Sequence, residues 1–335
     1  MGRGRIPPGV ARPDHHGRRH QDPYRRDVAA PGYRPAMTAE VREGQTFAGA
    51  SLLVRYLNFV KLPHTLFALP FALVGVLAAS RVAAVSLRIV LLVTVAFTAA
   101  RWVAMGFNRI ADRRYDALNP RTRDRELPTG ALTLTQAWLS VILAALVFVA
   151  AAGLLNPLCL ALSPVALGWV MLYSLTKRFT WWTHLWLGLG LAIAPVGGYL
   201  AVTGRWSDPW WVLPAITVAV ATWVAGFDIF YALPDEDFDR RSGLRSAVVK
   251  LGERRSILLA KLLHGLTIPA LVAFGFGAGF GVWYYVGVVV ATGILAYEHH
   301  LVRPGDHSRL DAAFFTMNGV MALVVFGFAL MDRIV

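Results

Sequence analysis

Oxygen-bearing side chains recur at a four-residue spacing in two places in this chain of 335 residues. Asn108, Asp112 and Asp116 form the first set, and Asp235 and Asp239 form the second. Residues four apart lie on one face of a helix, about 6 Å apart along its axis, so each set predicts a polar stripe. Oxygen ligands suit Mg²⁺, which proteins hold with a few carboxylates while the ion also contacts water and substrate phosphates. The two stripes therefore predict a Mg²⁺ site that faces a phosphate-bearing substrate.

Basic residues follow the first stripe. The segment 106–130 carries ten charged side chains in 25 positions, among them Arg121, Arg123 and Arg125. Arginines bind phosphate oxygens through paired hydrogen bonds, so a metal and these arginines together would bind a diphosphate. The chain contains no G-x-x-x-x-G-K-S/T loop, which argues against a nucleotide. Because both stripes follow apolar spans, an isoprenoid diphosphate fits best, with its charged head at the membrane interface and its tail among the helices.

The segments that carry these residues are long and apolar. The chain is 56% hydrophobic and only 16% charged, whereas soluble domains carry about 25% charged residues. About 20 helical residues cover a hydrocarbon core of roughly 30 Å. Nine windows of this length occur, at 62–80, 87–107, 136–154, 156–175, 183–203, 210–231, 257–277, 279–297 and 312–331. We expect an all-α, multi-span integral membrane bundle of nine transmembrane helices around a central cavity, with short turns at Asn156-Pro157 and at 277–281.

Lysine and arginine cluster in alternate loops of this predicted topology. The loops 101–134, 176–182, 233–256 and 298–311 hold 17 of them, and four lie on the other side, at Arg81, Arg88, Arg205 and Arg333. This bias is the positive-inside signal, and it predicts that the N-terminus and both acidic motifs are cytoplasmic. The net charge of +13 then reflects topology, and we expect no nucleic-acid partner. We expect an integral protein of a bacterial inner membrane, with the lipid bilayer in contact with its helices.

The first 45 residues differ from the rest of the chain. They are rich in Pro, Gly, Arg and His and show no apolar period, so they cannot bury enough surface to fold. We expect residues 1–45 to be a disordered basic tail, or a sequence upstream of a true start at Met37. Residues 46–335 would then form the membrane domain. The one cysteine, Cys159, excludes a disulfide within the chain and a cysteine metal site.

These motifs resemble the signatures of the UbiA superfamily of intramembrane aromatic prenyltransferases. The first family signature, N-x-x-x-D-x-x-x-D, is matched by Asn108, Asp112 and Asp116. The second, D-x-x-Y-x-x-x-D-x-x-x-D, is matched by Asp228, Tyr231, Asp235 and Asp239. Smaller matches are Arg125–Gly130, Tyr173 with Lys177, Lys61–Pro70 and Ala194–Gly198, the last two being similar to the 4-hydroxybenzoate branch. The resemblance covers roughly 55–335.

The resemblance implies a role for each matched residue. The metal set would be Asn108, Asp112, Asp235 and Asp239, with Asp116 supporting them or binding through water. The contacts to the diphosphate oxygens would come from Arg121, Arg123, Tyr173, Lys177 and Arg178. Metal and cations would neutralise the departing diphosphate, so that the allylic C–O bond can break. A phenolic ring would then attack the allylic cation in a cavity that excludes water.

Asp228 lies two helical turns deeper than Asp235, on nearly the same face. A carboxylate at that depth is costly to bury unless it has a partner or a function. We expect it to accept or polarise the phenolic proton of the acceptor; the alternative is a structural hydrogen bond to Tyr231 or Arg101. Arg101 itself could steady the first stripe or contact substrate, and His184 is expected to be a hydrogen-bonded structural histidine.

Two classes of function remain open at this point. The first is a Mg²⁺-dependent prenyltransferase that joins polyprenyl diphosphate to an aromatic acid in quinone synthesis. The acceptor would be 4-hydroxybenzoate or, alternatively, a naphthoate on the way to menaquinone. The second class is a cation-coupled membrane transporter, which would need ionisable residues near the bilayer midplane. The acidic motifs at helix ends favour the enzyme.

Overall fold

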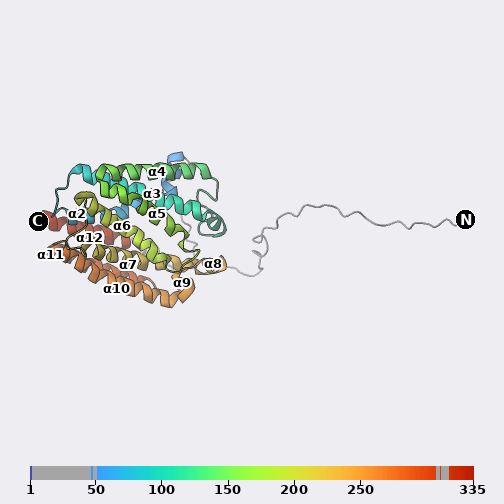
Figure 1. Ribbon diagram of the computed structural model, residues 1–335. Coiled ribbons are helices and arrows are strands. Elements are labelled where there is room, and N and C mark those ends of the chain that lie inside the picture. The colour runs from blue at the N-terminus through green and yellow to red at the C-terminus, as the bar shows by residue number, and fades with distance from the viewer. Residues whose placement is uncertain (2–46, 48–50, 307–309, 311–316) are drawn as a thin grey trace. The chain divides into compact units, whose positions relative to one another are not determined.

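The structure is a computed structural model that describes residues 1, 47, 51–306, 310 and 317–335, except the side chains of 62–67 (Figure 1). Within these residues the fold is all-α, as predicted, with one isolated bridge between Arg303 and Asp306. The helices are α1 (Leu52–Phe59), α2 (Leu62–Ala79), α3 (Leu87–Leu118), α4 (Leu134–Leu155), α5 (Pro157–Thr176), α6 (Thr183–Thr203), α7 (Val212–Ala232), η2 (Leu233–Asp235), α8 (Glu236–Arg241), α9 (Ala247–Leu251), α10 (Glu253–Gly277), α11 (Val282–Leu301) and α12 (Asn318–Ile334). The predicted tail, 1–45, lies outside the described residues apart from Met1, so its boundary stays a prediction.

Helices occupy the predicted apolar windows. Each of the nine windows overlaps one helix of the described chain, α2 to α7 and α10 to α12. Six of these, α3 to α7 and α10, are long and apolar enough to cross a membrane, among the residues described. A shorter apolar helical stretch is Ala68–Ala79 in α2. The chain is therefore a multi-span helical bundle, and the count of nine transmembrane helices stays a prediction.

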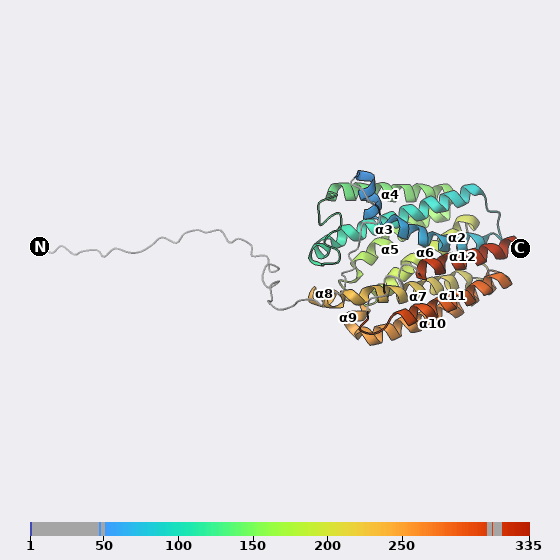
Figure 2. The same cartoon turned by 180° about the vertical axis from the view of Figure 1, so that it is seen from behind.

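The helices pack in a closed circuit. α3 packs against α4 and α5, α5 against α6, and α6 against α7. The circuit continues through α10, α11 and α12, and α12 returns to α2, which also packs against α3 and α6. Figure 1 and Figure 2 show α4 along one edge of this bundle and α10 along the opposite edge. The loop after α3, together with α8 and α9, lies at the end of the bundle away from the C-terminus (Figure 1).

A sharp turn joins α4 to α5. Asn156 ends α4, and its side chain accepts a hydrogen bond from the Cys159 backbone N–H at 2.9 Å, which caps the start of α5. Pro157 occupies the first position of α5, where a missing N–H costs nothing. The Asn156 amide also donates to the Leu200 carbonyl of α6 at 2.9 Å. The predicted turn at Asn156-Pro157 is confirmed, and it is anchored to a third helix.

Two glycines let α6 approach its neighbours closely. A Cβ atom added at Gly188 would lie 2.2 Å from the Ala221 carbonyl oxygen of α7. A Cβ atom added at Gly198 would lie 2.2 Å from the Ala72 carbonyl oxygen of α2. Only glycine permits backbone contact of this kind. These glycines therefore set the spacing of α2, α6 and α7.

The outer faces of α4 and α5 are strongly apolar. Large exposed side chains on them include Leu139, Ile142, Leu143, Leu146 and Leu160. A continuous apolar face of this extent marks a surface that contacts lipid or another partner. Both helices also meet the length and hydropathy of a membrane span. The exposed leucines are therefore what a bundle in a bilayer requires.

The last residues of the chain tie three helix ends together. Asp332 accepts hydrogen bonds from the backbone N–H groups of Gly281 at 2.7 Å and Tyr284 at 3.4 Å, at the start of α11. The Arg333 guanidinium donates to the carbonyls of Leu77 in α2 and of Ala278 after α10, both at 3.1 Å. The final turn of α12 thereby satisfies backbone groups that helix ends leave unpaired.

Candidate functional site

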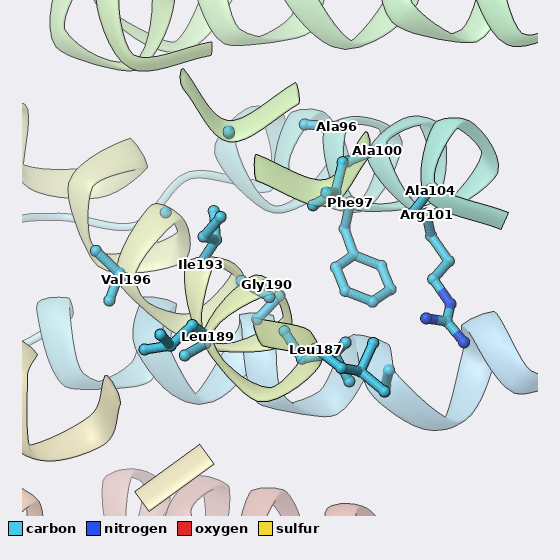
Figure 3. A pocket seen from close by; sticks show the side chains of 18 of the residues that line it. Ala96, Phe97, Ala100, Arg101, Ala104, Leu187, Leu189, Gly190, Ile193 and Val196 are labelled. Carbon is cyan, nitrogen blue, oxygen red and sulfur yellow. The ribbon is translucent and has the colours of Figure 1, made fainter. Parts of the chain in front are cut away.

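The bundle contains a partly open cavity of about 590 Å³. Side chains from α2, α3, α4, α5, α6, α7 and α12 line it, and most of them are apolar. Figure 3 shows Phe97, Leu187 and Ile193 pointing into the cavity from α3 and α6. Lined in this way, the cavity can hold a hydrocarbon chain away from water.

Polar side chains gather in one part of this lining. They include Asn108 and Arg101 on α3, Tyr173 near the end of α5, and Asp228 and Tyr231 on α7. Arg101 and Asn108 are seven residues apart and Asp228 and Tyr231 three apart, so each pair shares a helix face. The Arg101 Nε is buried and has no hydrogen-bond partner among the described residues. Figure 3 shows this side chain beside Ala104, beyond Phe97.

The first acidic motif lies on the last turns of α3. Asn108 Nδ2 donates to Asp112 Oδ2 at 3.1 Å, which confirms that the two share a face. Asp112 Oδ1 lies 3.4 Å from the Arg178 guanidinium, which follows α5. Asp116 is buried and pairs with Arg125 at 2.8 Å. The three predicted residues thus form the expected stripe, and two of them already pair with arginines.

The second acidic motif departs from the predicted continuous helix. α7 ends at Ala232, and a short 3₁₀ turn, η2, carries Asp235 before α8 carries Asp239. The physical reason is Pro234, which lacks the N–H that an α-helix would need there. Both carboxylates are nevertheless buried and paired. Asp235 forms an ion pair with Arg121, and Asp239 lies 2.9 Å from Lys177 Nζ.

The predicted diphosphate ligands divide into three groups. Arg121, Lys177 and Arg178 all pair with carboxylates of the two motifs. Tyr173 lines the cavity. Arg123 is exposed, and its side chain has no ion pair or side-chain hydrogen bond with the described residues. The structure therefore brings four of the five close to the acidic motifs or the cavity.

The charge of Lys177 follows from its neighbours. Burial lowers the pKa of its ammonium group, but the carboxylates of Asp239 and Asp235 outweigh burial and raise the pKa above its ordinary value. Lys177 therefore stays protonated at neutral pH. Arg121 also reaches from the motif toward the cavity, because its guanidinium lies 4.5 Å from the centre of the Tyr231 ring. Arg121 therefore connects the second acidic motif to the cavity wall.

The donor set fits Mg²⁺. It consists of carboxylates and one side-chain amide, and Asp116 Oδ2 is buried without a hydrogen-bond partner among the described residues. Within 51–306 and the other described positions, no three His, Cys, Asp or Glu side chains converge on one metal position. Mg²⁺ commonly takes only one or two carboxylates and completes its shell with water and substrate phosphate. A Mg²⁺ site shared between the two motifs stays a prediction.

The partner of Asp228 was not predicted. Asp228 Oδ2 lies 2.7 Å from Nδ1 of His184, a buried histidine at the start of α6. Neither Tyr231 nor Arg101, the partners expected if Asp228 is structural, forms a hydrogen bond with it among the described contacts. A histidine at the start of an apolar helix gives no sequence signal for this contact. The expectation that His184 is hydrogen-bonded is confirmed, and its partner is the cavity carboxylate.

Comparison with known proteins gives the family of this chain. Residues 68–320 match the model of the UbiA prenyltransferase family. A 4-hydroxybenzoate octaprenyltransferase from Nitrosococcus oceani is 32% identical over 242 residues, which are 72% of this chain and 84% of that protein. A 4-hydroxybenzoate octaprenyltransferase from Azotobacter vinelandii is 33% identical over 231 residues, which are 68% of this chain and 76% of that protein.

Solved structures of similar proteins agree with this family assignment. The apo structure of a UbiA homolog from Aeropyrum pernix K1 has a TM-score of 0.75 at 30% identity, covering 81% of this chain and 98% of that one. A UbiA homolog from Archaeoglobus fulgidus, solved with DMAPP and Mg²⁺, has a TM-score of 0.66 at 21% identity, covering 84% and 99%. At 21% identity, the similarity to the Archaeoglobus fulgidus structure shows a shared fold and nothing more. Together with the matched sequence motifs, these comparisons show that this integral membrane chain belongs to the UbiA prenyltransferase family.

Proposed function

We propose that this chain transfers a polyprenyl group from polyprenyl diphosphate to an aromatic acid in quinone synthesis, with 4-hydroxybenzoate as the acceptor. The observation that carries the proposal is the cavity. Its apolar walls suit a prenyl chain, and its polar part combines the Arg101 guanidinium with the Asp228 carboxylate. A cation and a base in one lining match the two ends of a hydroxylated aromatic acid. The relatives named 4-hydroxybenzoate octaprenyltransferase support this acceptor.

The acidic motifs would hold Mg²⁺ through Asn108, Asp112, Asp235 and Asp239, with Asp116 as support. When bound, Mg²⁺ would neutralise charge on the diphosphate and so ease departure of this group. The donor chemistry supports the assignment, as does the Archaeoglobus fulgidus homolog solved with DMAPP and Mg²⁺. Arg178 now balances Asp112, an arrangement that keeps the carboxylate compensated before substrate enters.

The basic residues would bind the diphosphate oxygens. Arg121, Lys177 and Arg178 each contact a motif carboxylate at present and would exchange part of that contact for phosphate. Tyr173 would donate from the cavity wall, and Arg123 would bind from the exposed loop. Charged donors around a dry site stabilise the leaving group strongly, because little solvent screens them.

The chemical step uses Asp228. The allylic C–O bond breaks with its electron pair passing to the diphosphate oxygen, and an aromatic carbon beside the phenol forms the new C–C bond. Asp228 accepts the phenolic proton as this bond forms. The proton on the alkylated carbon then passes to the released diphosphate, and Asp228 returns its proton to the ring oxygen, so that the phenol is restored and one proton is released in total. General-base assistance of this kind contributes about 10²–10⁴-fold.

The acceptor carboxylate would bind Arg101. Buried guanidinium groups favour carboxylates, which accept two parallel hydrogen bonds. A naphthoate acid, the alternative acceptor, carries the same carboxylate on a second ring. The two acceptors differ in size and not in this contact, so Arg101 does not discriminate between them.

Membrane preparations test the proposal. They are incubated with labelled polyprenyl diphosphate, Mg²⁺ and either 4-hydroxybenzoate or a hydroxynaphthoate, and the lipid extract is analysed for prenylated product. We expect product with 4-hydroxybenzoate. Product with the naphthoate alone would move the acceptor to menaquinone synthesis. No product with either acid, from protein that still binds the diphosphate, would contradict the proposed reaction and leave room for a cation-coupled transporter.

The proposed orientation has nine transmembrane helices in a bacterial inner membrane, with both acidic motifs cytoplasmic. The charge bias of the loops supports it. The loop after α3 lies at the same end of the bundle as α8 and α9, so both motifs would face one compartment (Figure 1). A water-soluble diphosphate head group would then reach the site from the cytoplasm, while its prenyl chain enters the cavity.

A further inference from the structure

Asp228 is held by an imidazole that is itself held from the other side. His184 is only 3% exposed, and its Nδ1 lies 2.7 Å from Asp228 Oδ2. Its second nitrogen, Nε2, accepts a hydrogen bond from the backbone N–H of Ala247, the first residue of α9, at 3.3 Å. Three separate elements, α6, α7 and α9, therefore meet at this one side chain.

The Ala247 contact determines the tautomer of His184. A backbone N–H can only donate, so Nε2 must carry a lone pair, and in the neutral ring the proton is then on Nδ1. Nδ1 accordingly donates to Asp228 Oδ2. The Asp228 carboxylate receives no other hydrogen bond among the described residues. One of its oxygens is thus occupied by His184, and Oδ1 is left for a ligand in the cavity that Asp228 lines.

The same segment of chain connects His184 to the second acidic motif. Leu244 N–H donates to the Asp239 carbonyl at 2.8 Å, and Arg245 N–H donates to the Lys177 carbonyl. Ala247 follows two residues later and donates to His184. Backbone hydrogen bonds thus fix the segment 244–247 against the ends of α5, α6 and α8. The position of the imidazole is set by this scaffold and not by the cavity alone.

We propose that His184 is a positioning residue for the prenyl transfer. It holds Asp228 Oδ2 through Nδ1–H, so that Oδ1 faces the acceptor hydroxyl and takes its proton. The inference rests on the proposed role of Asp228. A donor that bonds a catalytic carboxylate without touching the substrate fixes the orientation and the charge of that carboxylate. The Ala247 N–H completes the arrangement by excluding the other tautomer.

Two substitutions of the same histidine test this. His184→Leu fills similar space without a donor, whereas His184→Asn places an amide N–H near the position of Nδ1. Full-length protein is assayed with polyprenyl diphosphate, Mg²⁺ and the acceptor that the wild type prenylates. We expect kcat to fall about 10–100-fold in His184→Leu, a part of what a general base contributes, and to recover to within about fivefold of wild type in His184→Asn. The Kd for polyprenyl diphosphate should stay within about twofold in both variants.

A second acceptor separates proton transfer from packing. A fluorinated acceptor with an open carbon beside its hydroxyl is already ionised at the assay pH and needs no base. We expect the ratio of wild-type to His184→Leu kcat to shrink toward one with this acceptor. Equal ratios for both acceptors, or equal loss in His184→Leu and His184→Asn, would mean that His184 only packs and would overturn the inference.

Ala247→Pro tests the other side of the imidazole. Proline is tolerated at the first position of a helix, and Ser246 already has the extended conformation (φ −148°, ψ 168°) that a following proline prefers. The substitution removes the donor to Nε2 and keeps the Ser246 cap of Val249. We expect a loss of about 3–10-fold in kcat, smaller than that of His184→Leu because the contact to Asp228 remains. An unchanged kcat would refute the role of the tautomer.

Asp228→Asn distinguishes the two levels of the proposal. If Asp228→Asn turns over bound diphosphate at the wild-type rate, the role of Asp228 in the proposed function is wrong, and the inference falls with it. If Asp228→Asn is inactive while His184→Leu keeps the wild-type kcat, the proposed function stands and only the role of His184 is wrong. The expected order of kcat is wild type, His184→Asn, His184→Leu and then Asp228→Asn.

Discussion

Replacing Arg101 by leucine should weaken acceptor binding without weakening the fold. Arg101 lines the cavity, and its buried Nε has no hydrogen-bond partner among the described residues. A hydrogen bond between charged groups contributes about 1.5–3 kcal/mol. At about 1.4 kcal/mol per factor of ten, the acceptor KM should rise roughly 10–150-fold. Arg101→Lys keeps the charge but loses the planar guanidinium group. Its KM for the acceptor should therefore lie between those of the wild type and Arg101→Leu.

The free energy of unfolding should change little in Arg101→Leu or should increase. A buried charge that lacks a protein partner destabilises the empty protein, and leucine removes that cost. Arg88→Leu is the matched control. It lies on the same helix but outside the cavity lining and is exposed, with a donated hydrogen bond to the Leu154 carbonyl. We expect it to leave the acceptor KM unchanged.

The assay compares two acceptors that differ only in the carboxylate. Initial rates of prenylation are measured for 4-hydroxybenzoate and for phenol with wild type, Arg101→Leu and Arg88→Leu. If Arg101 binds the carboxylate, the substitution should raise KM for the acid and leave the much weaker use of phenol almost unaltered. An equal loss with both acceptors would refute the reasoning, since the guanidinium would then act on the diphosphate or on the cavity shape.

Three further outcomes are expected. Asp112→Asn should insert normally but lose most activity at low Mg²⁺, because it removes a charged ligand; near-normal turnover there would contradict the metal role. Gly188→Ala should lower the free energy of unfolding by about 1–3 kcal/mol, because its Cβ would lie 2.2 Å from the Ala221 carbonyl oxygen. Gly168→Ala is the control: its Cβ would meet nothing within 4 Å, so it should leave the thermal stability unchanged or raise it. In a cysteine-free background, Asp124→Cys should react with an impermeant thiol reagent from the cytoplasmic side and Arg205→Cys from the opposite side; labelling of both from one side would show the topology to be wrong.

Local patterns predicted the parts of the site that lie within one helix. The four-residue spacing of Asn108 and Asp112 predicted a shared face, and a hydrogen bond of 3.1 Å joins them. The Asn156-Pro157 pair predicted a turn because both residues have local preferences that stop one helix and start the next. The break after α7 coincides with Pro234, but proline alone does not predict it, because Pro70, Pro164, Pro195 and Pro269 lie inside helices.

Contacts between distant segments could not be predicted from the sequence. His184 and Asp228 are 44 residues apart, and Arg121 and Asp235 are 114 apart. Which arginine meets which carboxylate depends on how α3, α5 and α7 pack, and that packing depends on close contacts such as the one at Gly188. A single buried histidine has the same residue-level signal whether it supports a catalytic carboxylate or fills the core. Only the tertiary structure shows that His184 contacts Asp228.

The contacts of Asp332 and Arg333 affect the order in which the bundle can close. These two residues of α12 bond backbone groups at the ends of α2, α10 and α11, and Arg333 is 256 residues from its partner Leu77. Before α12 is inserted, α2 lacks the helix that packs beside it, and the circuit is open to lipid along that side. The circuit can therefore close only after the helices from α2 to α12 are all in place.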